Sequence, residues 1–534
     1  MNPTEKRIVP LSFILFLLWV SFQPLGALAQ KPNIIVILCD DLGIGDVGCF
    51  NSSGKIATPS IDQLAAEGIR FTNAHSSSAV CTPTRYSLLT GRYNWRSRLQ
   101  RGVLGGLSPR LIEPTVPTLA DYLKQQGYQT ACIGKWHLGM DWAKRSPEDP
   151  QFQDNIEKGA AGWKIDYEKK IENGPLAVGF DHFFGISASL DMVPYTFIQD
   201  AHVTQVPTVD VSHPMMLGRK PKQTTRRGPG YEGFDPADVL PKLVEQTELQ
   251  IRTWQSEQPE SPFFLYIPFA SPHTPIAPNP QWQGKSGLNP YADFVMETDA
   301  AIGKIDQLLQ ELEIADQTLL IVTSDNGCSP QADFAELANR EHHPSADYRG
   351  HKADIFEGGH RVPFVARYPG KIAPQRQSDQ LIGLQDIFAT VVDLLDSQVD
   401  DSTAVDSISW WPIALDQMPQ DENLLRQSLV HHSINGSFAI RRGPWKLCFC
   451  PDSGGWSNPR PNSPAAKDLP ALQLYQMQRD QAEQENLAQQ YPEVVLELTA
   501  EMDRLIQRGR TTPGAKQSNT VPVQWQAPEL EAPR

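Results

Sequence analysis

One cysteine in the sequence of 534 residues has the surroundings of a reactive group. Cys81 begins the stretch Cys-Thr-Pro-Thr-Arg, which contains Pro83 and Arg85. Pro83 suits the first turn of a helix, since its φ is already helical and its missing N–H would be unpaired there. Cys81 would then lie at a helix N-terminus, where free N–H groups favour an anion, and Arg85 adds a positive charge. Because positive surroundings lower a thiol pKa, we predict a reactive centre at Cys81; the alternative is a small buried cysteine in a turn.

Two acidic motifs follow hydrophobic runs of strand character. Asp40 and Asp41 come directly after an Ile- and Val-rich run, and Asp325 and Asn326 follow a second such run. Runs of this kind are typical of buried parallel strands, and parallel sheets bind ligands at the carboxyl ends of their strands. Adjacent carboxylates repel each other there, and hard oxygen ligands favour calcium or magnesium. We predict a cation site from the two motifs; the alternative for each is a solvated acidic turn.

Basic residues follow further strand-like runs. Lys135 and His137 lie in Gly-Lys-Trp-His-Leu-Gly, and His273 lies between two prolines, which leave the backbone little freedom. His360 lies in the motif Glu-Gly-Gly-His-Arg-Val-Pro and is a candidate for contact with substrate. Lys352 lies shortly before this motif. Singly, each is an ordinary loop residue. Together they predict a cationic pocket in a protein of formal net charge −15, which suits the hydrolysis of an anionic ester.

The order of these motifs resembles that of the type I sulfatases, within the alkaline phosphatase superfamily. Six separated elements occur in that family's order between residues 33 and 488. The resemblance implies that a formylglycine-generating or sulfatase-maturing enzyme oxidises Cys81 to formylglycine, whose hydrated aldehyde is the nucleophile. The family's usual serine at the fourth position is here Thr84, which keeps the hydroxyl. The resemblance also implies one Ca²⁺ ion per active site, bound by Asp40, Asp41, Cys81, Asp325 and Asn326.

The same resemblance implies the roles of the basic residues. Lys135 and Lys352 contact the sulfate, and His273 protonates the leaving alcohol. His137 takes a proton from the formylglycine, and Arg85 orients residue 81. The expected catalytic residues are thus Cys81, Arg85, Lys135, His137, His273 and Lys352. The expected substrate-binding residues are Lys135, His273, Lys352 and His360.

The expected function is that of a sulfuric ester hydrolase acting on an aryl sulfate or a sulfated carbohydrate. The stretch from Cys81 to Arg96 resembles exported bacterial sulfatases of polysaccharides, with a 6-sulfated galactose or N-acetylgalactosamine as the hypothesis for the substrate. Two alternatives stay open. One is a phosphodiesterase or phosphonate monoester hydrolase of the same superfamily, and the other is a non-catalytic, calcium-dependent binder of sulfated glycans. The acidic composition argues against nucleic acid as a partner.

The elements that must position these residues alternate between strand-like and helical patterns. We predict an α/β fold with a large mixed, mostly parallel sheet flanked by helices, as in alkaline phosphatase, and a smaller C-terminal α+β subdomain on an antiparallel sheet. The predicted core strands are residues 33–38, 128–134, 262–267, 318–323 and 364–368. The predicted helices include residues 118–126, 236–254, 296–312, 386–395 and 492–508. Residues 140–233 show little periodicity and are expected to form loops over the active face that carry specificity.

The ends of the chain have compositions of their own. Residues 1–29 read as a secretory signal peptide, with basic residues, a short apolar core and small residues before position 30. We therefore expect an exported protein, periplasmic or secreted, without stable membrane insertion after cleavage. The predicted domains are a catalytic domain at 30–400 and a C-terminal subdomain at 401–508. The polar, proline-rich tail at 509–534 is expected to be disordered.

Overall fold

The computed structural model describes residues 31–219, 223–419 and 425–525. One compact unit begins at Pro32, so the predicted catalytic domain and C-terminal subdomain belong to the same unit. The predicted signal peptide lies outside the described residues. Among the residues that the structure does describe, none of the helices has the length and apolar character needed to cross a lipid bilayer.

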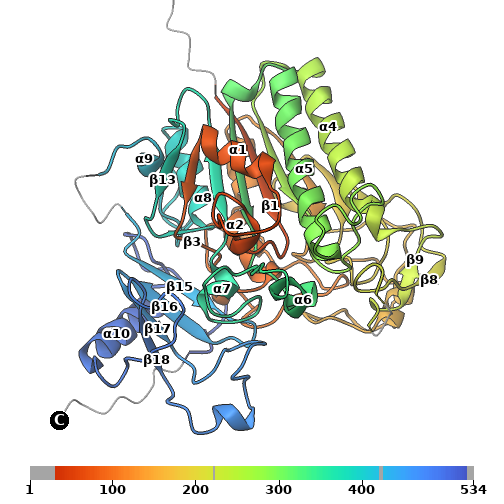
Figure 1. Ribbon diagram of the computed structural model, residues 1–534. Coiled ribbons are helices and arrows are strands. Elements are labelled where there is room, and N and C mark those ends of the chain that lie inside the picture. The colour runs from red at the N-terminus through yellow and green to blue at the C-terminus, as the bar shows by residue number, and fades with distance from the viewer. Residues whose placement is uncertain (1–30, 220–222, 420–424, 526–534) are drawn as a thin grey trace, which may run out of the picture. The chain divides into compact units, whose positions relative to one another are not determined.

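Ten strands of the described chain form a mixed sheet in the order β13-β2-β12-β11-β1-β10-β4-β5-β6-β7 (Figure 1). Their bounds are β1 Asn33–Cys39, β2 Ile69–Phe71, β4 Gln129–Lys135, β5 His182–Ile186, β6 Ile198–Gln199, β7 His202–Val203, β10 Phe263–Pro268, β11 Thr318–Ser324, β12 Phe364–Arg367 and β13 Arg376–Ser378. The neighbours β11, β1, β10, β4 and β5 run parallel. β1, β10 and β11 are buried along their whole length, which explains why their sequences are continuous apolar runs.

The strand order brings distant motifs to one edge of the sheet. β1 ends just before Asp40, and its neighbour β11 ends just before Asp325. On the other side of β1, β10 leads to the turn that contains His273, and β4 ends at Lys135. Because the four strands are parallel, their carboxyl ends meet at the same edge. The predicted strand-end motifs therefore become neighbours in space.

Helices flank the sheet in two groups that contact within themselves. α1, α4 and α5 form one group, and α2, α3 and α8 form the other (Figure 1). The helix bounds are α1 Pro59–Glu67, α2 Cys81–Thr90, α3 Leu119–Gln125, α4 Val239–Glu257, α5 Pro290–Glu311, α6 Phe334–Ala338, α7 Glu357–His360, α8 Asp386–Leu394, α9 Trp411–Ala414 and α10 Pro492–Arg508. α5 begins six residues before the predicted start because Asn289 caps it, its Oδ1 accepting from the N–H of Ala292 at 3.0 Å.

The C-terminal part is built on an antiparallel sheet in the order β15-β16-β17-β18. Its strands are β15 Ser428–His432, β16 Phe438–Arg442, β17 Trp445–Cys448 and β18 Gln473–Gln476, and α10 contacts β16. This sheet lies beside α7 (Figure 1). It also holds the segment that leads to Cys81, since the N–H of Ala79 donates to the carbonyl of His432 at 3.0 Å. The predicted fold class, with its smaller antiparallel sheet in the C-terminal part, is confirmed.

The described chain also contains two small sheets of two strands each. They pair β3 Ala74–His75 with β14 Ile382–Gly383, and β8 Val209–Val211 with β9 Gly228–Gly230. The second pair and β5 to β7 lie within residues 140–233, where we expected loops. The strands there are short, which is why they leave little periodicity in the sequence.

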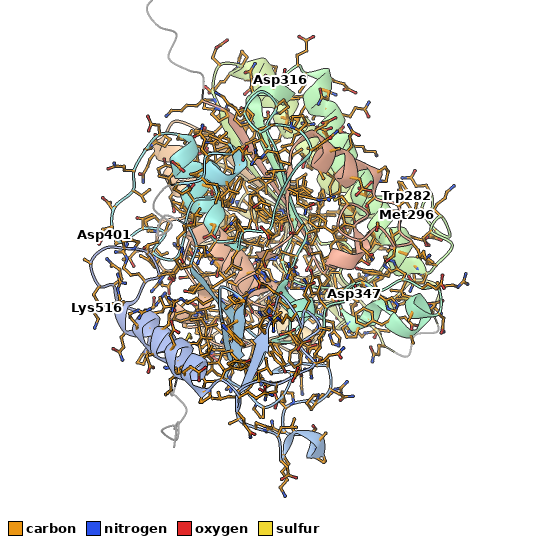
Figure 2. The ribbon with its side chains drawn as sticks, turned by 60° about the vertical axis from the view of Figure 1, so that its left-hand side comes forward. Trp282, Met296, Asp316, Asp347, Asp401 and Lys516 are labelled. Carbon is orange, nitrogen blue, oxygen red and sulfur yellow. The ribbon has the colours of Figure 1, made fainter. Side chains whose placement is uncertain are left out.

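Residues 509–525, for which composition predicted disorder, make specific contacts. Arg510 Nη1 lies 2.7 Å from Asp401 Oδ1. Asp401 and Lys516 lie on the same side of the molecule in Figure 2. Trp525 packs edge-on against two phenylalanines of the C-terminal part. Residues 509–525 of the predicted tail thus have specific partners in the folded body, and its residues 526–534 lie outside the described residues.

Candidate active site

Three carboxylates and three cations meet at the carboxyl edge of the large sheet. Lys135 Nζ lies 2.6 Å from Asp40 Oδ2, and Lys352 Nζ lies 2.7 Å from Asp41 Oδ1. The third pair is Arg85 with Asp325, whose Nη2 and Oδ2 are 2.7 Å apart. Each of the six is at most 5% exposed: Asp40, Asp41, Arg85, Lys135, Asp325 and Lys352. These predicted residues come from separate parts of the sequence and share one buried centre.

The ionisation of the carboxylates follows from this crowding. Burial opposes a charge on Asp40, but Lys135, His273 and Arg85 outweigh it and hold the pKa of Asp40 well below its usual range. Burial and the charge of Asp40 raise the pKa of Asp325 to about 7, against the influence of Arg85. Three acids and three permanent cations give the centre no surplus positive charge. A divalent cation would supply that surplus for an anionic substrate.

The residues present fit a calcium ion. Asp40 Oδ1 and Asn326 Oδ1 are buried and have no hydrogen-bond partner within the described part of the chain. The Asn326 amide nitrogen donates to Asp41 Oδ1 at 2.7 Å. The sulfur of Cys81 and carboxylate oxygens of Asp40 and Asp325 lie within 4.8 Å of one another. Unpaired buried oxygens are costly, and carboxylate and amide oxygens are the ligands that calcium prefers.

Cys81 is the first residue of α2, with Pro83 in the first turn as predicted. Thr84, the departure from the family's usual serine, uses its hydroxyl to donate to two carbonyls of the preceding segment. Burial raises the pKa of the Cys81 thiol, although Lys135 and Lys352 oppose this. The positive surroundings thus act in the predicted direction, but the predicted net lowering of this pKa is wrong. Desolvation of a fully buried thiol outweighs the two lysines.

The two predicted catalytic histidines have defined tautomers. His137 Nε2 donates to the carbonyl of Leu104 at 2.8 Å, so Nδ1 carries the lone pair. Burial and nearby cations hold the pKa of His137 well below its usual value, which keeps it a neutral base. His273 Nδ1 donates to the carbonyl of Thr274 at 2.6 Å, and its Nε2 lies 3.7 Å from Asp41 Oδ2. Asp41 and His137 have φ of 65° and 54°, a strained conformation common at active sites.

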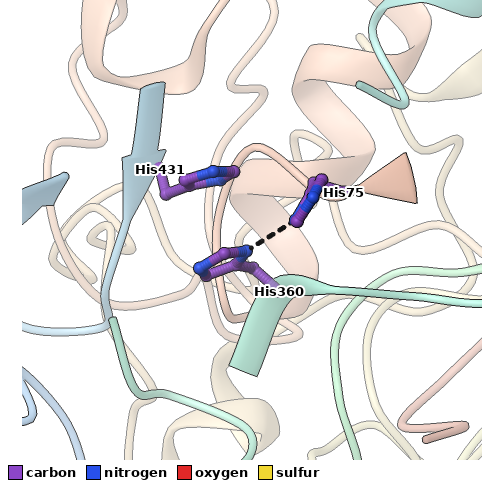
Figure 3. A group of neighbouring side chains, drawn as sticks. All are labelled: His75, His360 and His431. Atoms are coloured by element: carbon purple, nitrogen blue, oxygen red, sulfur yellow. Dashed lines mark hydrogen bonds between the residues drawn. The ribbon is translucent and has the colours of Figure 1, made fainter. Parts of the chain in front are cut away.

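His360 lies outside this centre, contrary to the prediction that it contacts substrate. It is fully buried, and its ring forms a triangle with those of His75 and His431 (Figure 3). Its Nδ1 is 3.1 Å from Nδ1 of His75, and its Nε2 is 3.0 Å from Lys446 Nζ. Lys446 in turn lies 3.1 Å from Glu357 Oε1. We call these five residues the histidine cluster; it joins α7 to the C-terminal sheet.

The histidine cluster has the composition of a metal site but not the geometry. Ring nitrogens of His75, His360 and His431 lie within 4.8 Å of one another. The rings of His360 and His431 are stacked, with centroids 3.8 Å apart and planes 13° apart (Figure 3). Lone pairs lie in the ring planes, so two stacked rings cannot direct them at one ion. The adjacent ammonium of Lys446 also repels a cation. We interpret the cluster as structural.

A cavity of about 230 Å³ opens onto Cys81, with Lys352 and His273 in its wall. Its other walls include polar and aromatic residues that the sequence did not single out: Ser189, Asp191, Arg226, Gln331 and Trp456. Irregular segments and one short 3-10 helix at Pro330–Ala332 carry them, so neither spacing nor periodicity marked them. A larger cavity of about 860 Å³ in the described chain contains none of the predicted catalytic residues, and we assign the site by chemistry rather than by size.

Comparison with known proteins gives consistent matches. The family profile described as Sulfatase matches residues 32–397. The chain is 33% identical over 507 residues to an N-acetylgalactosamine-6-O-sulfatase of Bacteroides thetaiotaomicron, a match that covers 89% of this chain and 93% of the relative. It is 30% identical over 490 residues to human arylsulfatase A, covering 86% and 84% of the two chains.

A solved structure agrees with the fold. It is a Bacteroides thetaiotaomicron protein described in connection with the metabolism of multiple glycosaminoglycans. It has a TM-score of 0.74 and 31% identity, and the match covers 89% of this chain and 99% of that one. The resemblance that the motifs indicated is thus confirmed across the catalytic part. The chain belongs to the sulfatase family, sulfuric ester hydrolases with the alkaline phosphatase-like fold.

Proposed function

We propose that the protein removes 6-O-sulfate from galactose-type sugars, such as N-acetylgalactosamine, in sulfated polysaccharides or glycosaminoglycans. The observation that carries the proposal is the buried centre in which Lys135, Lys352 and His273 lie with Cys81 and three carboxylates. Support for the sugar comes from the relative named as an N-acetylgalactosamine-6-O-sulfatase, which aligns with 89% of the chain. The predicted signal peptide supports export to the periplasm or outside, where such polymers occur.

Two groups that the chain must acquire complete the proposal. Oxidation of Cys81 to formylglycine by a maturing enzyme would supply an oxygen nucleophile in the form of a hydrated aldehyde. A calcium ion held by Asp40, Asp41, Asp325, Asn326 and residue 81 would supply positive charge that polarises the sulfate.

The chain's own residues divide the remaining work. Lys135 and Lys352 bind the sulfate oxygens and offset the charge that develops on them in the transition state. His273, once protonated, donates its Nε2 proton to the alcohol oxygen as the bond between that oxygen and sulfur breaks, while Nδ1–H stays on the Thr274 carbonyl. His137 would accept through Nδ1 the proton of the remaining hydroxyl of residue 81, and the aldehyde would re-form as the bond between its carbon and the sulfate oxygen breaks. Arg85 positions Asp325 and, through the carbonyl of Lys135 at 3.1 Å, the end of β4.

A panel of substrates tests the function. We expect kcat/KM for 6-O-sulfated N-acetylgalactosamine to exceed that for the 4-O-sulfated isomer by about 100-fold or more, because differential transition-state binding sets specificity. We expect a similar margin over the matched 6-phosphate, since the relatives that match the chain are sulfatases. The measurement is initial-rate kinetics on all three compounds. A phosphate ester hydrolysed as fast as the sulfate ester contradicts the proposal, and so does binding of the sulfated sugar without turnover by protein that carries formylglycine.

Removal of the metal provides a second test. At about 100 times its Kd, calcium is expected to stabilise the folded protein by about 2.7 kcal/mol, since it binds the assembled carboxylates and not the unfolded chain. The measurement is thermal unfolding with added calcium and with a chelator. Asp325→Ala is expected to abolish the difference in melting temperature between calcium and chelator. Asp316→Ala is expected to keep this difference, because Asp316 is an exposed surface residue (Figure 2). An equal melting temperature with and without calcium would rule out the assigned site.

A further inference from the structure

The cavity that opens onto Cys81 has wall residues that take no part in the proposed reaction at the sulfate. Lys352 and His273 lie in its wall with Cys81, where the sulfate is proposed to bind. Other parts of the wall come from residues 189–192, from Arg226 and from Trp456 of the C-terminal part. These segments are far apart in the sequence and meet at this cavity. Whatever is attached to the sulfate must contact them.

Asp191 is the most unusual member of this wall. It is 8% exposed, and its Oδ2 accepts from Arg226 Nη1 at 2.6 Å. The same Nη1 donates to the backbone carbonyl of Asp191 at 3.0 Å, and Tyr195 donates to the carbonyl of Arg226. The side chain is therefore held in one orientation. Its second oxygen, Oδ1, is buried and has no hydrogen-bond partner among residues 31–219, 223–419 and 425–525, and the same is true of Ser189 Oγ.

A buried carboxylate oxygen without a partner is rare in folded proteins, and here it lies in the wall of a cavity that a ligand could enter. Arg226 already balances the charge of Asp191, so the missing partner is a neutral donor such as a hydroxyl rather than a second cation. A sulfated sugar carries hydroxyls on the ring carbons beside the sulfated position. Trp456 is 37% exposed and offers an aromatic surface in the same cavity for the apolar side of the ring. At about 230 Å³ the cavity is smaller than typical sites for drug-sized ligands, and it suits one sugar ring.

We propose that Asp191 is a specificity residue that accepts a hydrogen bond through Oδ1 from a ring hydroxyl of the sulfated sugar. The inference rests on the proposed function and extends it from the sulfate to the sugar. It has a negative side as well: a second sulfate on that hydroxyl would place an anion against the carboxylate of Asp191 and be rejected. The enzyme would therefore discriminate among sulfated sugars by the free hydroxyl beside the scissile group.

The test compares a sugar with an aryl sulfate that has no ring hydroxyl. Asp191→Ala is expected to lower kcat/KM for 6-O-sulfated N-acetylgalactosamine by about 30- to 100-fold, the usual size of a lost hydrogen bond to a charged group. Turnover of 4-nitrophenyl sulfate is expected to stay within about threefold, because that substrate makes no such bond. Asp210→Asn is the matched control. Asp210 Oδ2 lies 3.9 Å from Nε of Arg227, the residue after Arg226, but Asp210 is not part of the cavity wall. Both rates should therefore be unchanged.

Deoxy sugars identify the hydroxyl and complete the test. The wild-type enzyme should hydrolyse one monodeoxy form of the 6-sulfated sugar more slowly than the parent sugar. Asp191→Ala should hydrolyse that deoxy form and the parent sugar at the same rate. An equal loss on sugar and aryl sulfate, or no loss on the sugar, overturns the role of Asp191 while leaving the proposed function intact. Failure of the wild-type enzyme to hydrolyse either sulfate ester overturns the proposed function and this inference with it.

Discussion

Replacing Cys81 with alanine is expected to lower kcat on the order of 10⁴-fold or more, for sugar and aryl sulfates alike. Alanine cannot be oxidised to formylglycine, so the proposed nucleophile would be lost, and removal of a nucleophile is among the most damaging changes to an enzyme. Binding of substrate should survive, because Lys135, Lys352 and His273 would still be in place. The measurement is single-turnover kinetics beside equilibrium binding of the sulfated sugar.

The wild-type protein offers a direct companion measurement. Mass spectrometry of the tryptic peptide that runs from Phe71 to Arg85 is expected to find an aldehyde at position 81 that a hydrazine reagent traps. Thr84 should not prevent this, since it keeps the hydroxyl. Cys49→Ala is the matched control for the kinetics of Cys81→Ala and is expected to keep full activity, because Cys49 is a half-buried thiol outside the cavity wall. A plain thiol at position 81 in an active enzyme would overturn the proposed nucleophile, as would full activity of Cys81→Ala.

Glu357→Ala is expected to lower the free energy of unfolding by about 3–5 kcal/mol, the usual cost of removing one partner of a buried ion pair. Glu357 Oε2 accepts from Arg361 at 2.9 Å and from Arg441 at 3.0 Å, and Oε1 lies 3.1 Å from Lys446 Nζ. Burial opposes the charge on Glu357, but Lys446 and Arg441 outweigh it and hold the pKa of Glu357 well below its usual value. Loss of this carboxylate leaves three cations facing one another with little water.

The effect should be measured by urea denaturation with a surface pair as the control. Glu311 lies 3.2 Å from Arg252, and both side chains are about half exposed. Glu311→Ala is expected to cost less than about 1 kcal/mol, because water screens exposed pairs. A cost for Glu357→Ala no larger than for Glu311→Ala would show that the histidine cluster does not stabilise the contact between α7 and the C-terminal sheet.

Several elements could be predicted from the sequence because they have local signatures. Strands buried on both faces appear as unbroken β-branched runs, so the positions of β1, β10 and β11 were recognisable within one or two residues. Asp40 and Asp325 follow such runs directly, so their location at strand ends followed as well. Pro83 marked the first turn of α2 for the same reason, since a proline constrains its own backbone.

Other expectations failed because they depend on how deeply a side chain is buried and on the direction in which it points. The charges around Cys81 were correctly named, but its complete burial, which raises the thiol pKa, is not visible in a local motif. His360 follows a glycine pair in the motif Glu-Gly-Gly-His-Arg-Val-Pro, yet the short helix α7 directs it into the histidine cluster (Figure 3). Asp191 and Trp456 lie in irregular segments, and nothing in their neighbours along the chain marks them as members of one cavity.

The family and the groups available for chemistry could thus be recognised without a structure, because each motif is a short stretch whose residue types and order are sufficient to identify it. The tertiary structure decided which of these groups meet. The order β11-β1-β10-β4 places the ends of strands from four parts of the chain side by side, and this makes one centre from Asp40, Lys135, His273 and Asp325. It also decided which oxygens are left unpaired, since pairing depends on partners tens to hundreds of residues away.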